Sequence, residues 1–255
     1  MTVLLLTATA AEQAEVAKRM DDCILQRRHG RDWRHGNLFG VPTRLVETGI
    51  GLVNTAQALT TALSIEAPEL VIQFGVAGAY STCGLDVGDV GIADREIYGD
   101  LGVRTATGWQ GAEIIGIPTV RLGPTGAHEA QYYNEFTADQ DLVRLALAIL
   151  DRDESWPADR PSLKAGPFIT VQECSGTKAL GDERARRFNA ICENMEGAAV
   201  AHLCVMERLP FLEIRGISNL VEDRDRDRWD LKKASARAQN AVTALLEARC
   251  AGEFQ

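Results

Sequence analysis

The sequence predicts an α/β fold, a three-layer sandwich in which helices cover both faces of a central mixed, mostly parallel sheet. Apolar segments of strand length alternate along the chain with helical patterns. The predicted strands are apolar on both faces, which is typical of parallel strands buried between helices. Because the 255 residues contain no internal repeat and no long polar linker, we expect residues 1–255 to form one domain.

The individual elements follow from these patterns. Strands are expected in the apolar segments Val3–Leu6, Thr43–Glu47, Glu69–Phe74, Leu163–Val171 and Phe211–Ser218, with further β character in VGDVGIADREI. Helices are expected in TATAAEQAEVAKRM and in Asn54–Ile65, Ala138–Leu150, Gly181–Asn189, Met195–Met206 and Leu231–Ala248. Loops are expected in QRRHGRDWRHG, in GVAGAYSTCG, in Glu222–Asp230 and across Gly99–Phe136, where a long loop indicates a functional segment.

Composition excludes several classes of protein. A formal net charge of −9 offers no electrostatic footprint for a nucleic acid. The six cysteines form no CxxC pair and the four histidines have no metal-ligand spacing, so we expect reduced thiols and no metal or cofactor. The N-terminal MTVLLLTATAA lacks the basic segment of a signal peptide, and no apolar run is long enough to span a membrane. After these exclusions, we expect a cytoplasmic protein that either binds a small organic ligand or acts on one as an enzyme.

Ligand sites of such sheets usually lie at the carboxyl ends of the strands. Four segments occupy such positions: Thr7–Glu12, Glu47–Gly51, Gly75–Tyr80 and Gly216–Asn219. The start of an apolar helix, Asn194–Met195–Glu196, is a fifth candidate.

Two carboxylates are the most informative residues. Glu196 opens the helix MEGAAVAHLCVM, which is apolar almost all round, and a carboxylate buried there is costly without a partner. Glu12 follows a buried strand in a first helical turn. Either acid could simply stabilise a helix N-terminus. The functional alternative is that both act on a ligand.

Other patterns are weak. ETGIGLVN resembles half of a dinucleotide-binding motif, but Asn54 stands where the third glycine belongs, and SGTK lacks the upstream glycine of a P-loop. Phe168 is more often a core residue than a platform for a base. GVAGAY suits close approach of the backbone to a ligand, or merely a tight turn.

Seven segments taken in order resemble the superfamily of purine nucleoside phosphorylases and nucleosidases, and within it the nucleosidases that act on methylthioadenosine and adenosylhomocysteine. They are LLLTATAAEQAEV, ETGIGLVNTAQA, VIQFGVAGAY, LDVGDVGIADREIYGD, AGPFITVQ, NMEGAAVAHLC and PFLEIRGISN. The C-terminal part, from NMEGAAVAHLC through LPFLEIRGISNLVEDRDRDRWDL, is similar to the futalosine hydrolases, which release hypoxanthine from futalosine in bacterial menaquinone synthesis.

The resemblance implies roles for matching residues. Glu12 matches the acid that activates water, Met195 and Glu196 match the pair beneath the ribose, and Phe168 matches an aromatic residue near the base. Asn219 stands where adenosine-type nucleosidases carry an aspartate, and it completes the catalytic set. The remaining substrate-binding residues implied by the resemblance are Gly49, Val76, Ala77, Gly78, Ile169, Asn194 and Ser218.

The implied chemistry is glycosidic. The sugar becomes oxocarbenium-like, and a carboxylate at its hydroxyls stabilises that charge while a second carboxylate acts as general base. An asparagine amide can donate to O6 or N7 of a 6-oxopurine, so Asn219 favours hypoxanthine over adenine.

Alternatives remain open at this stage. Phosphorolysis would need arginines around phosphate, and Arg44 and Arg95 keep it possible. A nucleoside-binding protein without catalysis would not need both carboxylates. Arg104 and Arg121 are candidates for binding the substituent at the 5′ position. The resemblance also implies a homodimer or a higher homo-oligomer.

Overall fold

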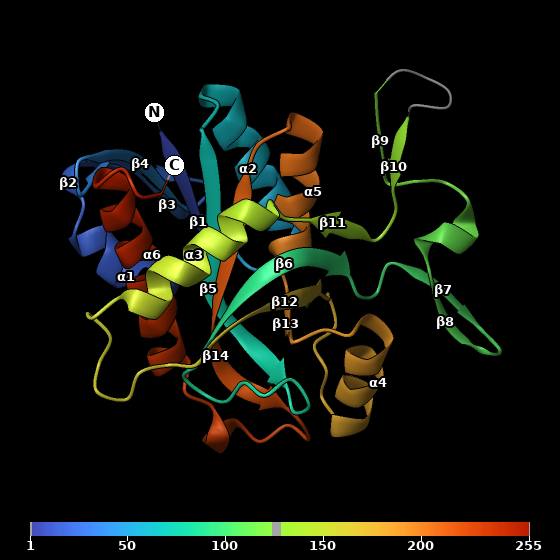
Figure 1. The fold of residues 1–255 in the computed structure, drawn as a ribbon. Coiled ribbons are helices and arrows are strands. Elements are labelled where there is room, and N and C mark those ends of the chain that lie inside the picture. Colours follow the sequence, from blue (N-terminus) through green and yellow to red (C-terminus); the bar gives the residue numbers. More distant parts are fainter. Residues whose placement is uncertain (1, 124–128, 255) are drawn as a thin grey trace.

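The computed structural model describes residues 2–123 and 129–254, and a twisted sheet runs through their centre (Figure 1). The strands of this main sheet are β1 (Val3–Thr7), β2 (Asp21–Arg28), β3 (Arg31–Leu38), β4 (Val41–Glu47), β5 (Leu70–Tyr80), β6 (Val90–Tyr98), β11 (Glu135–Thr137), β12 (Leu163–Thr170), β13 (Cys192–Asn194) and β14 (Phe211–Val221). The helices are α1 (Ala10–Lys18), α2 (Leu52–Ile65), α3 (Gln140–Arg152), α4 (Lys178–Phe188), α5 (Gly197–Glu207) and α6 (Leu231–Cys250).

The sheet is mixed, as the sequence predicts. Its order is β11-β6-β12-β13-β5-β1-β4-β3-β2, and β14 pairs with both β5 and β6. The run β4-β1-β5-β14 is parallel. Helices α1, α3 and α6 pack on one face and α2 and α5 on the other, which gives three layers (Figure 1).

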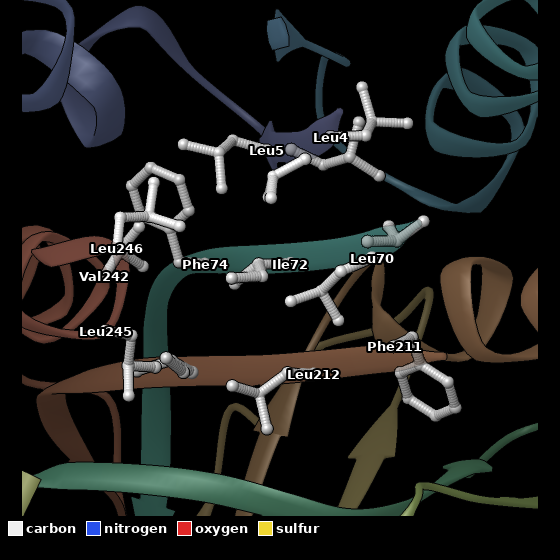
Figure 2. Close-up of a cluster of buried hydrophobic side chains, with 14 of the residues drawn as sticks. Leu4, Leu5, Leu70, Ile72, Phe74, Phe211, Leu212, Val242, Leu245 and Leu246 are labelled. Carbon is white, nitrogen blue, oxygen red and sulfur yellow. The ribbon is translucent and has the colours of Figure 1, made fainter. Parts of the chain in front are cut away.

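The core explains why these segments form strands. Leucines and isoleucines of β1, β5 and β14 point to both faces and, apart from the half-buried Leu220, are fully or almost fully buried. Figure 2 shows side chains of these three strands gathered against Val242, Leu245 and Leu246 of α6. Burying apolar surface on both faces stabilises the parallel strands and leaves their polar carboxyl ends as the place for a site.

Three expectations about the main sheet are corrected. The segment QRRHGRDWRHG forms the hairpin β2–β3 instead of a loop, and its turn is made by His29 and Gly30, both at positive φ. Its polar composition is that of an exposed edge strand, which charged residues protect from pairing with other chains. Strand β5 continues through GVAGAY to Tyr80, and the short strand β13 was not predicted.

The segment Gly99–Phe136 is also more ordered than expected. It contains the hairpins β7 (Gly102–Thr105) with β8 (Gly108–Gly111) and β9 (Val120–Leu122) with β10 (Ala130–Tyr132), besides the 3-10 helix η1 (Ala112–Ile115). Residues 124–128 of this predicted loop lie outside the described residues. The hairpins extend from one side of the molecule (Figure 1). Short strands without apolar alternation gave no signal in the sequence.

Two findings bear on the class of protein. No helix among residues 2–123 and 129–254 is long and apolar enough to cross a membrane. Within these same ranges, no group of three or more His, Cys, Asp or Glu residues is arranged to hold a metal ion.

Candidate active site

A cavity of about 430 Å³ opens where β1, β5 and β14 end and α5 begins. Nine of the twelve residues proposed from the sequence line it, and they come from four separate segments of the chain. These nine are Glu12, Val76, Ala77, Gly78, Asn194, Met195, Glu196, Ser218 and Asn219.

Three proposed residues do not line the cavity. The side chains of Phe168 and Ile169 are fully buried in the apolar core. Phe168 therefore does not stand beside the cavity as a platform for a base, and the core role that its type favours is the correct one. Gly49 bends the chain at φ +83° and donates its N–H to the carbonyl of Ala8, while its neighbour Ile50 reaches the cavity.

Glu12 combines the two roles considered for it. Its Oε2 accepts hydrogen bonds from the N–H and hydroxyl of Thr9, both at 2.9 Å, which stabilises the start of α1. Its Oε1 accepts from the N–H of Val76 at 2.9 Å and lies at the cavity wall. Burial raises the pKa of this carboxyl above its ordinary value, against the opposing effect of Arg215. A raised pKa suits a group that accepts a proton near neutral pH.

Glu196 lies at the start of α5, where its side chain turns toward the cavity instead of capping the helix. Its Oε1 accepts from the N–H of Gly51 at 3.0 Å. Its Oε2 lies 3.4 Å from both terminal nitrogens of Arg215. The carboxylate is 4% exposed, so these partners offset the cost of burying its charge.

Arg215 is the main residue that the sequence argument missed. It is fully buried in β14, where its Nε donates to Glu213 at 2.8 Å and Nη2 to the Asn194 side chain at 3.2 Å. Burial alone would lower the pKa of Arg215, but Glu213, Glu196 and Glu12 raise it, so it stays charged. The signal was present: Glu213 and Arg215 stand two apart in an apolar strand and so share a face.

A buried pair of carboxyls supports Arg215 from behind. Glu96 of β6 accepts from Thr170 at 2.8 Å and from Asn194 at 2.5 Å. A Cβ added to Gly197 would lie 2.2 Å from Glu96 Oε1 and 2.3 Å from Glu213 Oε2, so the two carboxyls converge over this glycine. Burial and the neighbouring Glu213 raise the pKa of Glu96 far above its ordinary value. Glu96 therefore holds a proton, and Glu213 neutralises Arg215.

Asn219 reaches the cavity because of a β-bulge. The register of β14 against β5 shifts between Ile217 and Asn219, which makes Ser218 the extra residue. In a regular strand, successive side chains point to opposite faces, whereas the bulge lets both Ser218 and Asn219 line the cavity. Ser218 donates its hydroxyl to Asn219 Oδ1 at 2.8 Å, and Asn219 Nδ2 donates to the carbonyl of Leu220 at 3.1 Å.

The cavity thus has two ends. The carboxylate end consists of Glu12 and Glu196, has Arg215 behind it, and lies at Val76 of β5. The amide end consists of Ser218, Asn219 and Trp229 and lies at Gly78, two residues further along β5. Trp229 is the aromatic side chain in the wall, and the guanidinium of Arg224 sits 4.6 Å from its ring centre. Both residues belong to the loop Glu222–Asp230 that the sequence predicts.

The other arginines considered lie elsewhere. Arg44 is buried and donates to the carbonyls of Ala62 and Glu66. Arg95 pairs with acids of β6 and β11, and neither Arg44 nor Arg95 lines the cavity. Arg104 lines a second cavity of about 680 Å³ beside the hairpins. Arg121 is exposed on β9 and lines neither of these two cavities.

Comparison with known proteins agrees with this architecture. The Phosphorylase superfamily matches residues 2–248. The futalosine hydrolase of Thermus thermophilus is 33% identical over 215 residues, 84% of either chain. The 5′-methylthioadenosine/S-adenosylhomocysteine nucleosidase of Bacillus cytotoxicus is 26% identical over 249 residues, 97% of this chain and 99% of its own. The structure of the corresponding S. pneumoniae nucleosidase with the transition-state inhibitor MT-ImmA has a TM-score of 0.79 at 24% identity, covering 98% and 100% of the two chains.

The chain belongs to the Phosphorylase superfamily. Its relatives include hydrolases and nucleosidases. The chain is therefore an enzyme of the nucleosidase type, which cleaves N-glycosidic bonds.

Proposed function

We propose that this enzyme hydrolyses the N-glycosidic bond of futalosine and releases hypoxanthine. The observation that carries the proposal is the cavity with two buried carboxylates at one end and an amide at the other. Glu12 activates water as general base. Glu196 binds the ribose hydroxyls and stabilises the positive charge that develops on the sugar.

Water is preferred to phosphate as the nucleophile for an electrostatic reason. Among the described residues that line the cavity, Arg224 is the only cation, and it stacks on Trp229 at the amide end. Arg215 lies behind the carboxylate end but is already engaged by Glu213 and Glu196. A phosphate dianion approaching Glu12 would meet a carboxylate instead of a free arginine.

Hypoxanthine is preferred to adenine because of Asn219. Its amide can donate to O6 or N7 of a leaving 6-oxopurine, whereas an aspartate would place an acceptor against O6. Cleavage of methylthioadenosine or adenosylhomocysteine is the second candidate.

The substituent at the 5′ position of futalosine carries a carboxylate, for which we propose Arg104. This arginine lines the second cavity together with Glu173, and Cys174, the next residue along the chain, lines the first.

We further propose a homodimer or higher homo-oligomer, because Ile50 and Val53 beside the site are 57% and 78% exposed. Sedimentation equilibrium tests the oligomer, and a monomer at micromolar concentration would overturn it.

The deciding experiment offers the enzyme futalosine, methylthioadenosine and inosine, each with and without phosphate. Chromatography of the released base and sugar then identifies the reaction. We expect hypoxanthine from futalosine in phosphate-free buffer, with free sugar as the co-product. A strict requirement for phosphate would overturn hydrolysis, and adenine release from methylthioadenosine alone would select the second candidate.

A further inference from the structure

Glu193 of β13 is a carboxylate in the cavity wall to which the proposed mechanism assigns no role. It is 7% exposed and lines the same cavity as Asn219. Its Oε2 accepts from the hydroxyls of Tyr80 at 2.9 Å and Ser175 at 2.7 Å, and Arg184 lies 3.6 Å away. These contacts hold the side chain in one position.

One oxygen of this carboxylate has capacity left. Among the described residues, Oε1 accepts only the N–H of Ser175, at 2.8 Å. A carboxylate oxygen has about two acceptor sites, so Oε1 can accept one more hydrogen bond. Burial, with Glu193 as the next cause, raises the pKa of Tyr80 well above its ordinary value. Tyr80 therefore remains a donor to Oε2 and does not compete for the free position on Oε1.

The sheet register places Glu193 opposite Asn219. Glu193 pairs with Gly78 from one side of β5, and Asn219 pairs with Gly78 from the other. Paired residues on neighbouring strands point to the same face, and two strand spacings separate their Cα atoms by about 10 Å. Gly78 between them carries no side chain, and an added Cβ would lie 3.1 Å from Asn219 Nδ2. That Cβ would also lie 3.0 Å from Val221 Cγ2, so Val221 borders this position on the β14 side, while β5 itself adds no side chain between Glu193 and Asn219.

We propose that Glu193 is a second base-reading residue, whose Oε1 accepts the N1–H of a 6-oxopurine lying over Gly78 with its O6 and N7 edge toward Asn219. This inference rests on the proposed function and deepens it. A 6-oxopurine carries a donor at N1, whereas a 6-aminopurine carries an acceptor there. A carboxylate can only accept, so it matches the first base and opposes the second.

The experiment measures binding of free hypoxanthine and free adenine to the full chain by titration calorimetry. In Glu193→Gln the amide can donate to N1 of adenine. We expect hypoxanthine to bind about 10- to 100-fold more weakly, the usual result of a lost hydrogen bond with an unsatisfied partner, and adenine to bind equally or more tightly. Glu207→Gln, an exposed acid at the end of α5 that lines neither cavity, is the control and should change neither affinity.

Kinetics on futalosine separate recognition of the base from a merely structural role. Glu193→Gln should raise KM more than it lowers kcat, and it should shift the ratio of kcat/KM for futalosine over its 6-amino analogue toward the amino compound. Equal losses on both bases and both substrates would mean that Glu193 only supports Tyr80 and Ser175, and the proposal would fall.

A measurement on the unmodified enzyme does not depend on folding of the variant. 1-Methylhypoxanthine keeps O6 and N7 but lacks the N1 donor, so we expect it to bind at least tenfold more weakly than hypoxanthine. Equal binding would overturn the role of Glu193. If hypoxanthine binds as expected but futalosine is not cleaved, the proposed substrate fails and the role of Glu193 stands. No binding of hypoxanthine would overturn both.

Discussion

The two ends of the cavity are built on different physical principles. At the carboxylate end, Glu12 and Glu196 are almost fully buried and fixed by Arg215, backbone N–H groups and a helix start. At the amide end, Asn219 is positioned by a β-bulge and by Ser218, and the charged Arg224 nearby is exposed. A preorganised charge arrangement suits the stabilisation of a transition state, whereas hydrogen-bond donors and acceptors in fixed directions suit discrimination between bases. We therefore assign the chemistry to the first end and the specificity to the second.

The largest effect should come from neutralising the carboxylate end. Glu196→Gln removes the negative charge that stabilises the oxocarbenium-like sugar, and Glu12→Gln removes the general base. Each should lower kcat by at least ~10²-fold in a steady-state assay of hypoxanthine release. Glu15→Gln, an exposed acid of the same helix that pairs with Lys18, is the control and should be near normal. Near-normal turnover of either active-site variant would leave that residue only a structural role, through its contacts with Thr9 and Val76 for Glu12 or with Gly51 and Arg215 for Glu196.

Removing Arg215 should damage the fold as well as the reaction. Arg215→Met leaves Glu213 and Glu196 buried without their cation. Breaking a buried ion pair in this way costs about 3–5 kcal/mol in the free energy of unfolding. Urea denaturation measures this loss, with the exposed Arg224→Met as the control, expected within about 0.5 kcal/mol of the parent. Equal stability of the two variants would show that the network does not hold the carboxylate end.

A change at the amide end should alter the choice of base more than the rate. Asn219→Asp keeps the acceptor for the Ser218 hydroxyl but replaces the Nδ2 donor with an acceptor. The lost hydrogen bond costs about 1–3 kcal/mol, so kcat/KM on futalosine should fall roughly ten- to hundredfold. Activity on the 6-amino analogue should fall less or rise. If the ratio for the two substrates does not move, Asn219 does not read the base.

Loss of the contact with the 5′ substituent, which lies outside the carboxylate and amide ends of the cavity, should have a smaller effect. Arg104 is exposed, and exposed ion pairs contribute about 0.2–1 kcal/mol, so Arg104→Ala should lower kcat/KM on futalosine by at most about fivefold. A nucleoside with a neutral 5′ group should be unaffected. Arg121→Ala is the matched control from the neighbouring hairpin. Similar losses on the charged and neutral substrates would exclude Arg104 as the partner of the carboxylate.

A separate expected effect, on stability instead of on activity, is a slope of the free energy of unfolding with pH. Burial and Glu213 raise the pKa of Glu96 far above the ordinary 4.5. The folded chain therefore holds a proton that the unfolded chain releases, and stability falls as the pH rises from 4.5 toward the raised pKa. Glu96→Gln mimics the protonated acid and should flatten this slope in thermal melts between pH 5 and pH 9, an interval of about four units chosen to span that release. Parallel slopes for the two proteins would show that Glu96 is not the proton holder.

Much of the fold could be predicted from periodicity. Strand-length apolar segments located β1, β4, β12 and β14, and helical patterns located the major helices within a few residues of their ends. The failures share one cause. The hairpin β2–β3 and the strand β13 have little apolar content of their own, and they are strands because neighbouring strands supply their hydrogen bonds. The prediction that residues 1–255 form one domain stays a prediction.

The sequence by itself determined which polar residues stand at the end of a buried strand or at the start of a buried helix. These positions selected Glu12 and Glu196, and the family resemblance selected Asn219. Only the tertiary structure decided which side chains share a cavity, because this depends on register and on bulges. It buried Phe168 in the core, it joined Arg215 to three glutamates, and it set Glu193 across Gly78 from Asn219. A one-residue shift in strand register turns a side chain to the opposite face, and no local pattern in the sequence reveals such a shift.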